Sequence, residues 1–507
     1  MLKIFIFLTF LSISTLYSRV YYISTNGDNN KECQSEKSAC RIEKFLSLIS
    51  KIEAGDTISF ERGQHFFLKK SQKLKFVNLQ ATQNRPILIN SYGEGEKPII
   101  DTKIAISSKW KRRESNLWCT PLKDQTARLW IEQKEQKRGS LERLSDTVPW
   151  QWRDENLCIY SNTSPKKISV NGTDYPLLFQ NSSYIYISDL DIQGGANGSI
   201  RIKNSNNITI KKCIIGKDSG YGITVKDAKQ ITIKNNLIDA NFKIYYKQRF
   251  KGVARGANDG VFLGRSVTFS NILYNEFRGW GHSGVSASSQ EPSEIAYNQI
   301  SFNYFSAKGL SYGRGIDYSG NVHHNTITYN YIKDTSTQNQ LNGYNNYFAY
   351  NIIDGVLDTP LKRGEQGNGI SLEDYQGDNH HNQIVHNIIK DTQGSAIAFI
   401  ALGEKSLYRV IDNNISSNIF INCGKGSRYR TLYIPAYSDI KEQYIQNNTF
   451  IKSQTRAISY RDQTLTIKEF NNKTDNKIRG NIERSISYQI EEEIEQRRAK
   501  ILDSISW

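Results

Sequence analysis

The sequence predicts an all-β protein that folds as a single-stranded parallel β-helix, and two sequence repeats carry this prediction. In the first repeat a small residue precedes a short alternation of apolar and polar residues, at 222–225, 260–263, 284–287, 315–318, 369–372 and 396–399. Gly343 and Tyr344 fit this pattern less well. Successive glycines from Gly198 to Gly369 lie 24 to 38 residues apart, and a period in this range is typical of a solenoid.

The second repeat consists of asparagines that flank isoleucines between the first segments. It includes Asn271, Asn275, Asn298, Asn303, Asn325, Asn330, Asn382, Asn387, Asn414 and Asn418. Short strands joined by glycine and asparagine corners account for both repeats, whereas helical repeats would need longer segments with a 3.6-residue period. Asparagines at one corner of successive coils would stack at about 4.8 Å and satisfy buried backbone groups. We therefore predict that most of the asparagines are structural.

Residues 1–18 are predicted to form a secretory signal peptide. Lys3 supplies a positive charge, residues 4–16 form an apolar run, and Ser18 is a small residue before a cleavage point. The apolar run is too short to span a membrane. We expect a mature protein without a membrane span that is secreted, periplasmic or held at the cell surface.

The chain has a formal net charge of +16. A basic exported protein tends to meet anionic polymers such as acidic polysaccharide, nucleic acid or lipopolysaccharide, and a solvated lysine-rich surface explains the charge equally well. Among these partners we predict an anionic polysaccharide and no nucleic acid. Six cysteines in 507 residues are too few for a disulfide scaffold, although Cys33 could pair with Cys40 and Cys119 with Cys158.

Residues 19–105 are predicted to form an N-terminal cap and the first coils. Apolar residues recur at helical spacing within 42–52, which indicates an amphipathic helix. A β-helix exposes its core and unpaired strand edges at each end, so this helix would serve as a lid.

Three motifs in this region carry a family resemblance. They are the opening Tyr-Tyr-Ile-Ser at 21–24 with Asn-Gly-Asp at 26–28, Ala-Gly-Asp-Thr-Ile at 54–58, and Tyr-Gly-Glu-Gly at 92–95 with Pro-Ile-Ile-Asp at 98–101. Together with the asparagine repeats, they resemble the pectate-lyase-like superfamily of right-handed parallel β-helix proteins. The resemblance implies a right-handed coil and a carbohydrate-active protein. It does not choose a reaction, because that superfamily includes lyases, glycosidases, epimerases and proteins with no known catalysis.

Residues 106–175 interrupt the coil pattern and are predicted to form an inserted β-rich subdomain. This segment holds five of the seven tryptophans: Trp110, Trp118, Trp130, Trp150 and Trp152. They could stack on sugar rings or form the small core of the insertion. The main β-helix is expected to run over 176–463, and a C-terminal cap or tail over 464–507 with a charged helix at 483–505 that covers the final coil.

A long basic loop is predicted where the interval between Gly222 and Gly260 reaches 38 residues. The excess sequence at 241–256 is rich in lysine, arginine and tyrosine and contains no acidic residue. Binding residues on rigid scaffolds concentrate in such loops. Lys247, Lys251 and Arg255 are therefore predicted substrate-binding residues, with an unliganded solvated loop as the alternative.

Candidate catalytic residues lie on the coils that follow this loop. Alternation from the glycines places Asp317 and Glu373 on the outward face, with Tyr347 as a further substrate-binding candidate, and the corner before the glycines carries Asp259, His282 and Arg314. Consecutive coils lie roughly 4.8 Å apart, so Asp259 and Asp317 would be separated by roughly 9.6 Å. That spacing is at the upper edge of the range of about 6.5–9.5 Å for an inverting glycosidase.

The histidine pairs at 323–324 and 380–381 precede asparagines and are predicted to be stacked repeat residues. Metal ligands must converge on one point, so no metal site is predicted, although a calcium ion is compatible with the chemistry considered below.

The sequence favours an enzyme that cleaves a polysaccharide, and it favours β-elimination from an acidic glycan over hydrolysis. A lyase needs a base and a cation, which the basic loop with His282, Arg314 or Tyr347 would supply. A glycoside hydrolase would use Asp259, Asp317 and Glu373. A non-catalytic glycan-binding surface protein is the third alternative.

Overall fold

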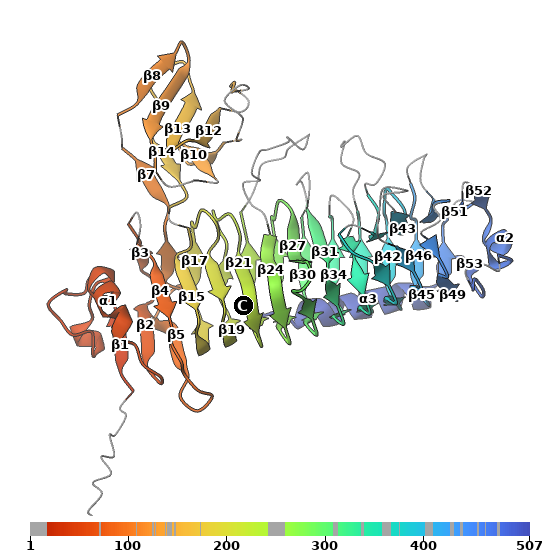
Figure 1. Ribbon diagram of the computed structural model, residues 1–507, viewed down its shortest axis with the longest axis horizontal. Helices are drawn as coiled ribbons and strands as arrows, with labels where there is room; N and C mark the ends of the chain where they lie inside the picture. Colours follow the sequence, from red (N-terminus) through yellow and green to blue (C-terminus); the bar gives the residue numbers. More distant parts are fainter. Residues whose placement is uncertain are drawn as a thin grey trace, which may run out of the picture.

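The computed structural model describes residues 18–507 except 70–71, 108, 124–125, 127, 137, 139–143, 147–148, 173, 242–258, 308–312, 336–338, 357–366, 375, 401–408, 426–429, 437–439, 454–455, 462 and 474–476. It confirms the predicted all-β fold, a parallel β-helix whose short strands stack coil upon coil along one axis (Figure 1). The predicted signal peptide lies outside the described residues apart from Ser18.

Each coil contributes strands to parallel ladders that run the length of the solenoid. The first ladder contains β4 (Leu74–Val77), β15 (Leu177–Gln180), β18 (Ile200–Lys203), β21 (Ile223–Lys229), β24 (Asp259–Thr268), β27 (Ser283–Ser289), β31 (Arg314–Gly320), β35 (Asn339–Leu341), β39 (Ile370–Glu373), β43 (Ile397–Ile400), β47 (Leu432–Ile434) and β51 (Ile458–Tyr460). A short ladder continues from the end of β24 through β28 (Ile295–Ala296), β32 (Val322–His323), β36 (Gly343–Tyr344), β40 (Asn379–His380), β44 (Val410–Ile411) and β48 (Ile440–Lys441).

Two further ladders close the coil. The second ladder contains β1 (Val20–Ile23), β2 (Thr57–Glu61), β5 (Ile87–Tyr92), β16 (Ser183–Ser188), β19 (Asn206–Lys211), β22 (Thr232–Lys234), β25 (Asn271–Leu273), β29 (Gln299–Ser301), β33 (Thr326–Thr328), β37 (Tyr347–Ala349), β41 (Gln383–Val385), β45 (Asn414–Ser416) and β49 (Tyr444–Gln446). The third ladder is a separate sheet of β3 (His65–Phe67), β6 (Ile99–Asp101), β17 (Asp191–Gln193), β20 (Ile214–Ile215), β23 (Leu237–Asp239), β26 (Glu276–Arg278), β30 (Tyr304–Ser306), β34 (Tyr331–Lys333), β38 (Ile352–Asp354), β42 (Ile388–Lys390), β46 (Ile419–Ile421), β50 (Thr449–Ile451) and β53 (Ile482–Arg484).

The core consists of inward side chains stacked in register. On the second ladder one such row is almost entirely isoleucine, and every member is at most 2% exposed: Ile187, Ile210, Ile233, Ile272, Ile300, Ile327, Phe348, Ile384, Ile415 and Ile445. Burying one such side chain contributes about 1.5–3 kcal/mol. The alternation read from the sequence therefore corresponds to a continuous apolar column.

Two asparagine ladders hold the corners on either side of the second ladder. In each, one side-chain oxygen accepts from both the backbone N and the Nδ2 of the asparagine one coil before, as Asn325 Oδ1 does from Asn298 at 3.0 and 2.9 Å. The residue before each asparagine has positive φ, for example 58° at Tyr297 and 53° at His324. The structural role predicted for the asparagines is confirmed.

The recurring glycines make room for an aromatic stack at the corner between the third and first ladders. A Cβ atom on Gly284 would lie 2.3 Å from Cδ1 of Phe305, whose ring stacks on that of Phe277 with centroids 4.7 Å apart. Any larger residue would have to displace a buried ring. The glycine repeat thus reflects close packing at this corner.

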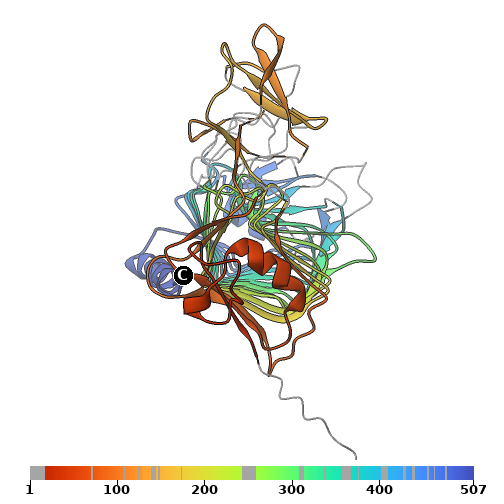
Figure 2. The ribbon, with the colours of Figure 1, turned by 90° about the vertical axis from the view of Figure 1, so that its left-hand side faces the viewer.

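The N-terminal end of the coil is closed by helix α1 (Ile42–Leu48), which lies across the opening (Figure 2). It buries Ile42, Phe45 and Leu48 against the first coils, and the disulfide Cys33–Cys40 closes the loop before it. At the other end, helix α2 (Ile467–Asn471) packs Phe470 on Tyr460 after the antiparallel strand β52 (Gln463–Leu465). The predicted N-terminal lid is confirmed.

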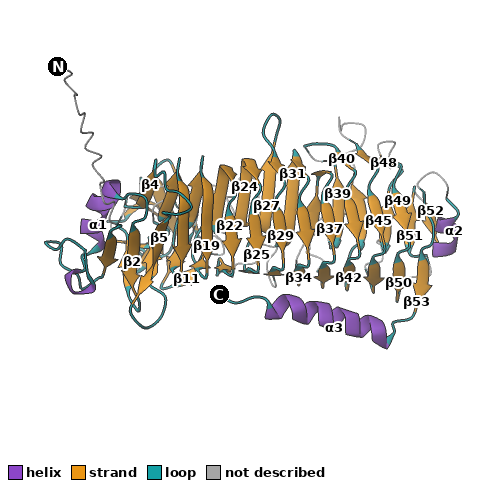
Figure 3. Cartoon of the chain, turned by 90° about the horizontal axis from the view of Figure 1, so that it is seen from below, coloured by secondary structure: helices purple, strands orange, loops and turns teal. Residues whose placement is uncertain are grey.

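Helix α3 (Tyr488–Asp503) does not cover the final coil as predicted. It lies along the outside of the third ladder and runs back across several coils (Figure 3). Its Ile494 and Ile501 are buried against Tyr331, Ile352, Ile388, Ile421 and Ile451 of successive strands, and Trp507 Nε1 donates to Glu276 Oε2 at 3.1 Å. The amphipathic stripe was predicted correctly, but the surface that it covers was not.

The segment between β6 and β15 forms a small subdomain that rises above the N-terminal coils (Figure 1). It has one antiparallel sheet of β7 (Ile104–Ile106), β14 (Ile168–Val170), β10 (Leu129–Ile131) and β11 (Lys134–Glu135), and another of β8 (Lys111–Glu114), β9 (Leu117–Pro121), β13 (Asn156–Tyr160) and β12 (Trp150–Arg153). The disulfide Cys119–Cys158 joins β9 and β13. Trp150 lies in the subdomain core, and the indole N–H groups of Trp118, Trp150 and Trp152 donate to backbone carbonyls. These contacts favour the small-core reading over sugar stacking.

Candidate active site

Two insertions of the solenoid lie at the corner where the third ladder passes to the first. The subdomain lies between β6 and β15, and the basic segment 242–258 lies between β23 and β24. Asp259 is the first residue of β24, and His282 and Arg314 occupy the corresponding corner of the next two coils. The predicted catalytic residues therefore lie at the corner where these two segments are inserted in the sequence.

His282 lies between two carboxylates contributed by the coils on either side of it. Its Nδ1 is 2.7 Å from Asp259 Oδ1, and its Nε2 is 3.0 Å from Asp317 Oδ2. Ser283 Oγ lies 3.2 Å from the same Nδ1. The His282 side chain is 20% exposed while those of Asp259 and Asp317 are 4% and 6% exposed, so the imidazole is the part of this cluster that reaches solvent.

Asp317 is fixed from its other side by an arginine. Arg314 Nη1 lies 2.7 Å from Asp317 Oδ1 and donates to Gln340 Oε1 at 2.7 Å. Ser283 Oγ lies 3.5 Å from Asp317 Oδ2. Both members of the ion pair are buried, because their side chains are only 8% and 6% exposed. Asp317 thus acts as a fixed anion that holds Arg314 and His282.

The charges set the protonation of the cluster. Burial by itself lowers the pKa of His282, but Asp259 and Asp317 together outweigh it and raise that pKa above its ordinary 6.5. Burial would raise the pKa of Asp317, but Arg314 and then His282 hold it well below its ordinary value. With His282 protonated, two cations balance two carboxylates. Loss of its proton leaves a basic imidazole with Asp259 beside Nδ1.

The structure brings together four of the nine predicted site residues: Asp259, His282, Arg314 and Asp317. Glu373 lies on the outward face of β39, two coils beyond Asp317, which is roughly 9.6 Å along the axis. Lys247, Lys251 and Arg255 lie outside the described residues. Two members of the cluster were missed in the sequence, namely Ser283 and Gln340.

The predicted placement of Tyr347 beside the cluster is wrong. Tyr347 belongs to β37 of the second ladder, where it pairs with Thr326 and Gln383. The residue that follows Asp317 along the first ladder is Gln340 of β35, and Gly343 belongs to β36 of the short ladder. The prediction assumed that each recurring glycine begins a strand of the first ladder. It failed here because β35, the described first-ladder strand of this coil, does not begin with a glycine.

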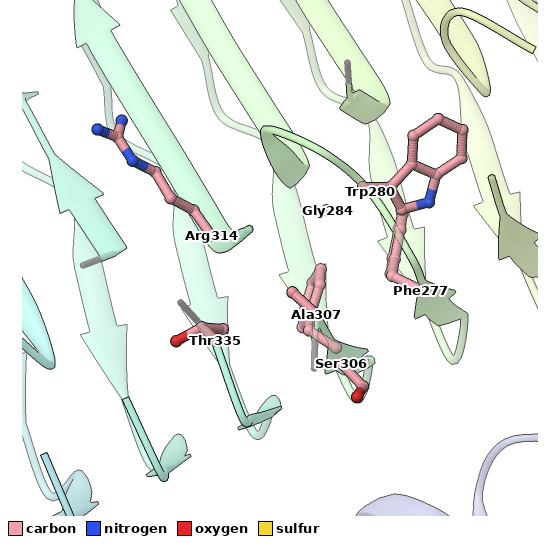
Figure 4. A pocket seen from close by; sticks show the side chains of 8 residues that line it. Phe277, Trp280, Gly284, Ser306, Ala307, Arg314 and Thr335 are labelled. Atoms are coloured by element: carbon pink, nitrogen blue, oxygen red, sulfur yellow. The ribbon is translucent and has the colours of Figure 1, made fainter. Parts of the chain in front are cut away.

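A small hollow at the same corner has Arg314 in its lining. Phe277, Trp280, Gly284 and Ala307 line it, while the guanidinium of Arg314 extends away from the side chains of Ser306 and Thr335 (Figure 4). The Trp280 indole is held by a hydrogen bond of 2.9 Å from Nε1 to the Ile238 carbonyl. Arg314 thus belongs both to the charged cluster and to the lining of this hollow.

In the two histidine pairs, His323 and His380 lie in a stacked row, as predicted. The rings of His323 and His380 lie on either side of Tyr344, with centroid distances of 4.6 and 4.8 Å. Within the described part of the chain, no group of three or more His, Cys, Asp or Glu side chains is arranged to hold a metal ion. No helix among the described residues is long and apolar enough to cross a membrane.

Comparisons with known proteins agree with the fold. A family model described as the right-handed β-helix region matches residues 153–256, which is less than half of the chain. The resemblance to the right-handed parallel β-helix superfamily is thereby confirmed for the fold. No curated protein sequence matches the chain.

Solved structures with a similar fold share little sequence with this chain. A glycoside hydrolase has 10% identity and a TM-score of 0.49 over 94% of this chain and 98% of its own. A mannuronic-acid-specific polysaccharide family 6 lyase from human gut microbiota has 11% identity and a TM-score of 0.44 over 96% of each chain. A GH136 lacto-N-biosidase from Eubacterium ramulus has 14% identity and a TM-score of 0.41 over 83% of this chain and 68% of its own. Similarity at this level assigns neither reaction nor substrate.

Proposed function

We propose that this protein is an exported polysaccharide lyase that cleaves an acidic glycan by β-elimination at the cluster around His282. One observation carries the proposal: a single imidazole, held between two carboxylates, is the most solvent-accessible side chain of a buried charged cluster on the outward face. A histidine in this position can accept a proton from a bound sugar once it is neutral.

The reaction assigns a role to each group. In a uronic acid unit, the base removes the proton from C5, the bond from C4 to the glycosidic oxygen breaks, and a C4–C5 double bond forms. The leaving oxygen takes up a proton from solvent. Neutral His282 is the proposed base, Asp259 orients its ring, and Asp317 with Arg314 fixes its position. Lys247, Lys251 and Arg255 remain predicted contacts to the sugar carboxylates, whose neutralisation favours the reaction.

A glycoside hydrolase is disfavoured by the state of Asp317. A hydrolase of this kind needs one carboxylic acid with a raised pKa and one carboxylate. Asp317 is instead bound to Arg314 and His282, which keep its pKa low and its charge permanent. Asp317 therefore cannot be the acid, and it is a poor base because Arg314 and His282 already occupy both of its oxygens.

Export is supported by the disulfides. The pairs Cys33–Cys40 and Cys119–Cys158 are both formed, and structural disulfides persist in oxidising compartments. The signal peptide predicted at 1–18 agrees with a location outside the cytoplasm.

The test compares two products of cleavage. Purified protein is incubated with acidic and neutral polysaccharides while the ultraviolet absorbance of unsaturated sugar ends and the number of reducing ends are followed. We expect both signals to rise together on an acidic glycan, and to fall at least about 100-fold in His282→Gln. The control His381→Gln alters an exposed histidine of another corner and should leave the rate unchanged. Reducing ends without absorbance would overturn the lyase in favour of a hydrolase, and silence of both signals would favour a binding protein.

A further inference from the structure

The outward face of the first ladder continues from the cluster toward the N-terminus as two registered rows. In one row Arg201, Thr224 and Phe262 follow one another, and Phe262 is in the same strand as Asp259. In the next row Lys203 pairs with Lys226, and Lys226 pairs with Gly264. The basic residues therefore lie one and two coils from Asp259, roughly 4.8 and 9.6 Å along the axis.

Cations crowd together on these two coils. Among the described residues, no carboxylate lies within ion-pair distance of Arg201, Lys203 or Lys226, whereas Arg265, on the next coil, pairs with Asp227 at 3.4 Å. Burial lowers the pKa of Lys226, and the charges of Arg201 and Arg265 lower it further. Like charges held this close repel one another, so an anion placed among them would be bound favourably.

Aromatic rings lie beside these cations. Arg201 lies over the ring of Tyr175 and Lys226 over the ring of Phe262, each 5.5 Å from the centroid. Tyr221 packs on Phe262 with centroids 6.0 Å apart and an interplanar angle of 56°. All of these rings are partly exposed. A sugar unit has an apolar face that suits an aromatic ring and, if acidic, a charge that suits the cations.

A glycine keeps this arrangement open. A Cβ atom on Gly264 would lie 2.6 Å from Cε1 of Phe262 and 3.4 Å from Cε of Lys226. The ring and the lysine stem therefore occupy the space that any other residue at this position would fill. This packing places the Lys226 ammonium and the Phe262 ring at one point of the outward face.

We propose that Arg201, Lys203 and Lys226, with the rings of Tyr175, Tyr221 and Phe262, form a binding subsite for an acidic sugar unit on the N-terminal side of the His282 cluster. The proposal rests on the proposed function, because it takes the glycan to lie along the same outward face. The chemistry that this subsite recognises is an anionic substituent, carboxylate or sulfate, next to a sugar ring. The subsite lies on one side of the cluster only, because strands β35 and β39 on the other side contain no equivalent lysine pair.

The chain offers a matched control for the test. Lys203 and Lys226 lie in the same two coils as Lys211 and Lys234, which are also in register with each other but belong to the second ladder. The double variants Lys203→Gln/Lys226→Gln and Lys211→Gln/Lys234→Gln therefore remove the same charge from the same coils. Both are made with His282→Gln so that cleavage cannot change the ligand during measurement.

The experiment measures binding of size-matched tetrasaccharides of uronate, sulfated neutral sugar and neutral sugar by titration calorimetry. We expect the Lys203/Lys226 variant to bind the preferred anionic tetrasaccharide at least about tenfold more weakly and with a smaller salt dependence, while the Lys211/Lys234 variant stays within about twofold. Comparison of the uronate with the sulfated ligand decides which anion is recognised. Gly264→Ala should weaken the same binding by displacing Phe262.

Two results would overturn the subsite. One is equal loss of affinity in both double variants, which would indicate a general effect of net charge. The other is binding of the neutral tetrasaccharide as tightly as either anionic one. The proposed function is tested separately. If binding depends on Lys203 and Lys226 but the unaltered protein does not cleave the glycan, the subsite is retained and the lyase is rejected.

Discussion

The Nε2 atom of His282 lies 3.0 Å from Oδ2 of Asp317, a carboxylate whose other oxygen lies 2.7 Å from Arg314 Nη1. Because Arg314 already satisfies Asp317, the interaction with His282 can break without leaving a buried, unpaired anion. The contact of the imidazole with Asp317 can thus break, while its contact with Asp259 on the other side remains. This asymmetry gives the cluster a definite pH dependence.

Catalytic activity should rise with pH. The proposed base is neutral His282, and the two carboxylates raise its pKa above 6.5, so kcat/KM should increase through that raised value. Asp259→Asn removes the larger of the two stabilising charges and should move the rise to lower pH by about one unit or more. A pH profile of kcat/KM for both proteins measures the shift. An unmoved profile would exclude His282 as the titrating base.

Stability should respond to the same group in the opposite direction. A pKa that is higher in the folded than in the unfolded protein stabilises the fold fully below the unfolded value, here the ordinary 6.5, and this contribution disappears as pH rises through the folded value. The free energy of unfolding of the unaltered protein, relative to His282→Gln, should therefore decline from pH 6 toward pH 9. Urea titrations of both proteins across this range test the prediction, and a difference independent of pH would contradict it.

Removal of Arg314 should destabilise the fold as well as the site. Arg314→Met leaves the buried Asp317 carboxylate without its guanidinium, and loss of one partner from a buried pair costs about 3–5 kcal/mol. Restoring neutrality with Arg314→Met/Asp317→Leu should recover part of this stability, which separates the unpaired charge from lost packing. The control Arg153→Met breaks an exposed pair with Asp154 and should cost at most about 1 kcal/mol. Equal effects of Arg314→Met and Arg153→Met would contradict the burial argument.

Loss of an asparagine from the middle of a ladder should also be costly. Asn330 Nδ2 donates to the Ile300 carbonyl and to Asn351 Oδ1, while its Oδ1 accepts from the backbone N and Nδ2 of Asn303 at 3.0 Å each. Asn330→Ala leaves these buried groups unsatisfied and should reduce the free energy of unfolding by at least about 3 kcal/mol. Asn197→Ala, at an exposed asparagine, should stay within about 1 kcal/mol. Thermal unfolding followed by circular dichroism compares the two.

Most of the fold could be predicted from the sequence because each coil repeats the same pattern of apolar strand residues and asparagine corners. The apolar alternation marks strands, and the asparagines mark corners whose backbone groups need a stacked amide, as at Asn298 and Asn325. The same regularity brought Asp259, His282, Arg314 and Asp317 onto consecutive coils. Register in a solenoid is thus predictable wherever the repeat is intact.

The errors occur where the repeat changes. In the coil after β31, the inward position is filled by buried Asn339, whose Oδ1 accepts from the backbone N–H groups of Gly315 and Ile316. Counting from the recurring glycines therefore placed Gly343 on the first ladder, which put Tyr347 beside the cluster and left Gln340 out of it. The destination of α3 was missed because an apolar helix stripe does not specify its partner. The paired isoleucines Ile352–Ile353 were an available signal, since two apolar neighbours on one strand mark both faces as covered.

Helix α3 affects how the solenoid is expected to unfold. Coils of a solenoid ordinarily contact only their neighbours, so such arrays fray from their ends and unfold in pieces. Here one helix packs against strands from β34 to β50, and Trp507, which follows the helix, donates to Glu276. The C-terminal coils are therefore linked to one another through this helix as well as through their own strands. We expect the helix to make the unfolding of these coils more cooperative, and it can pack only after the strands that it covers have been synthesised.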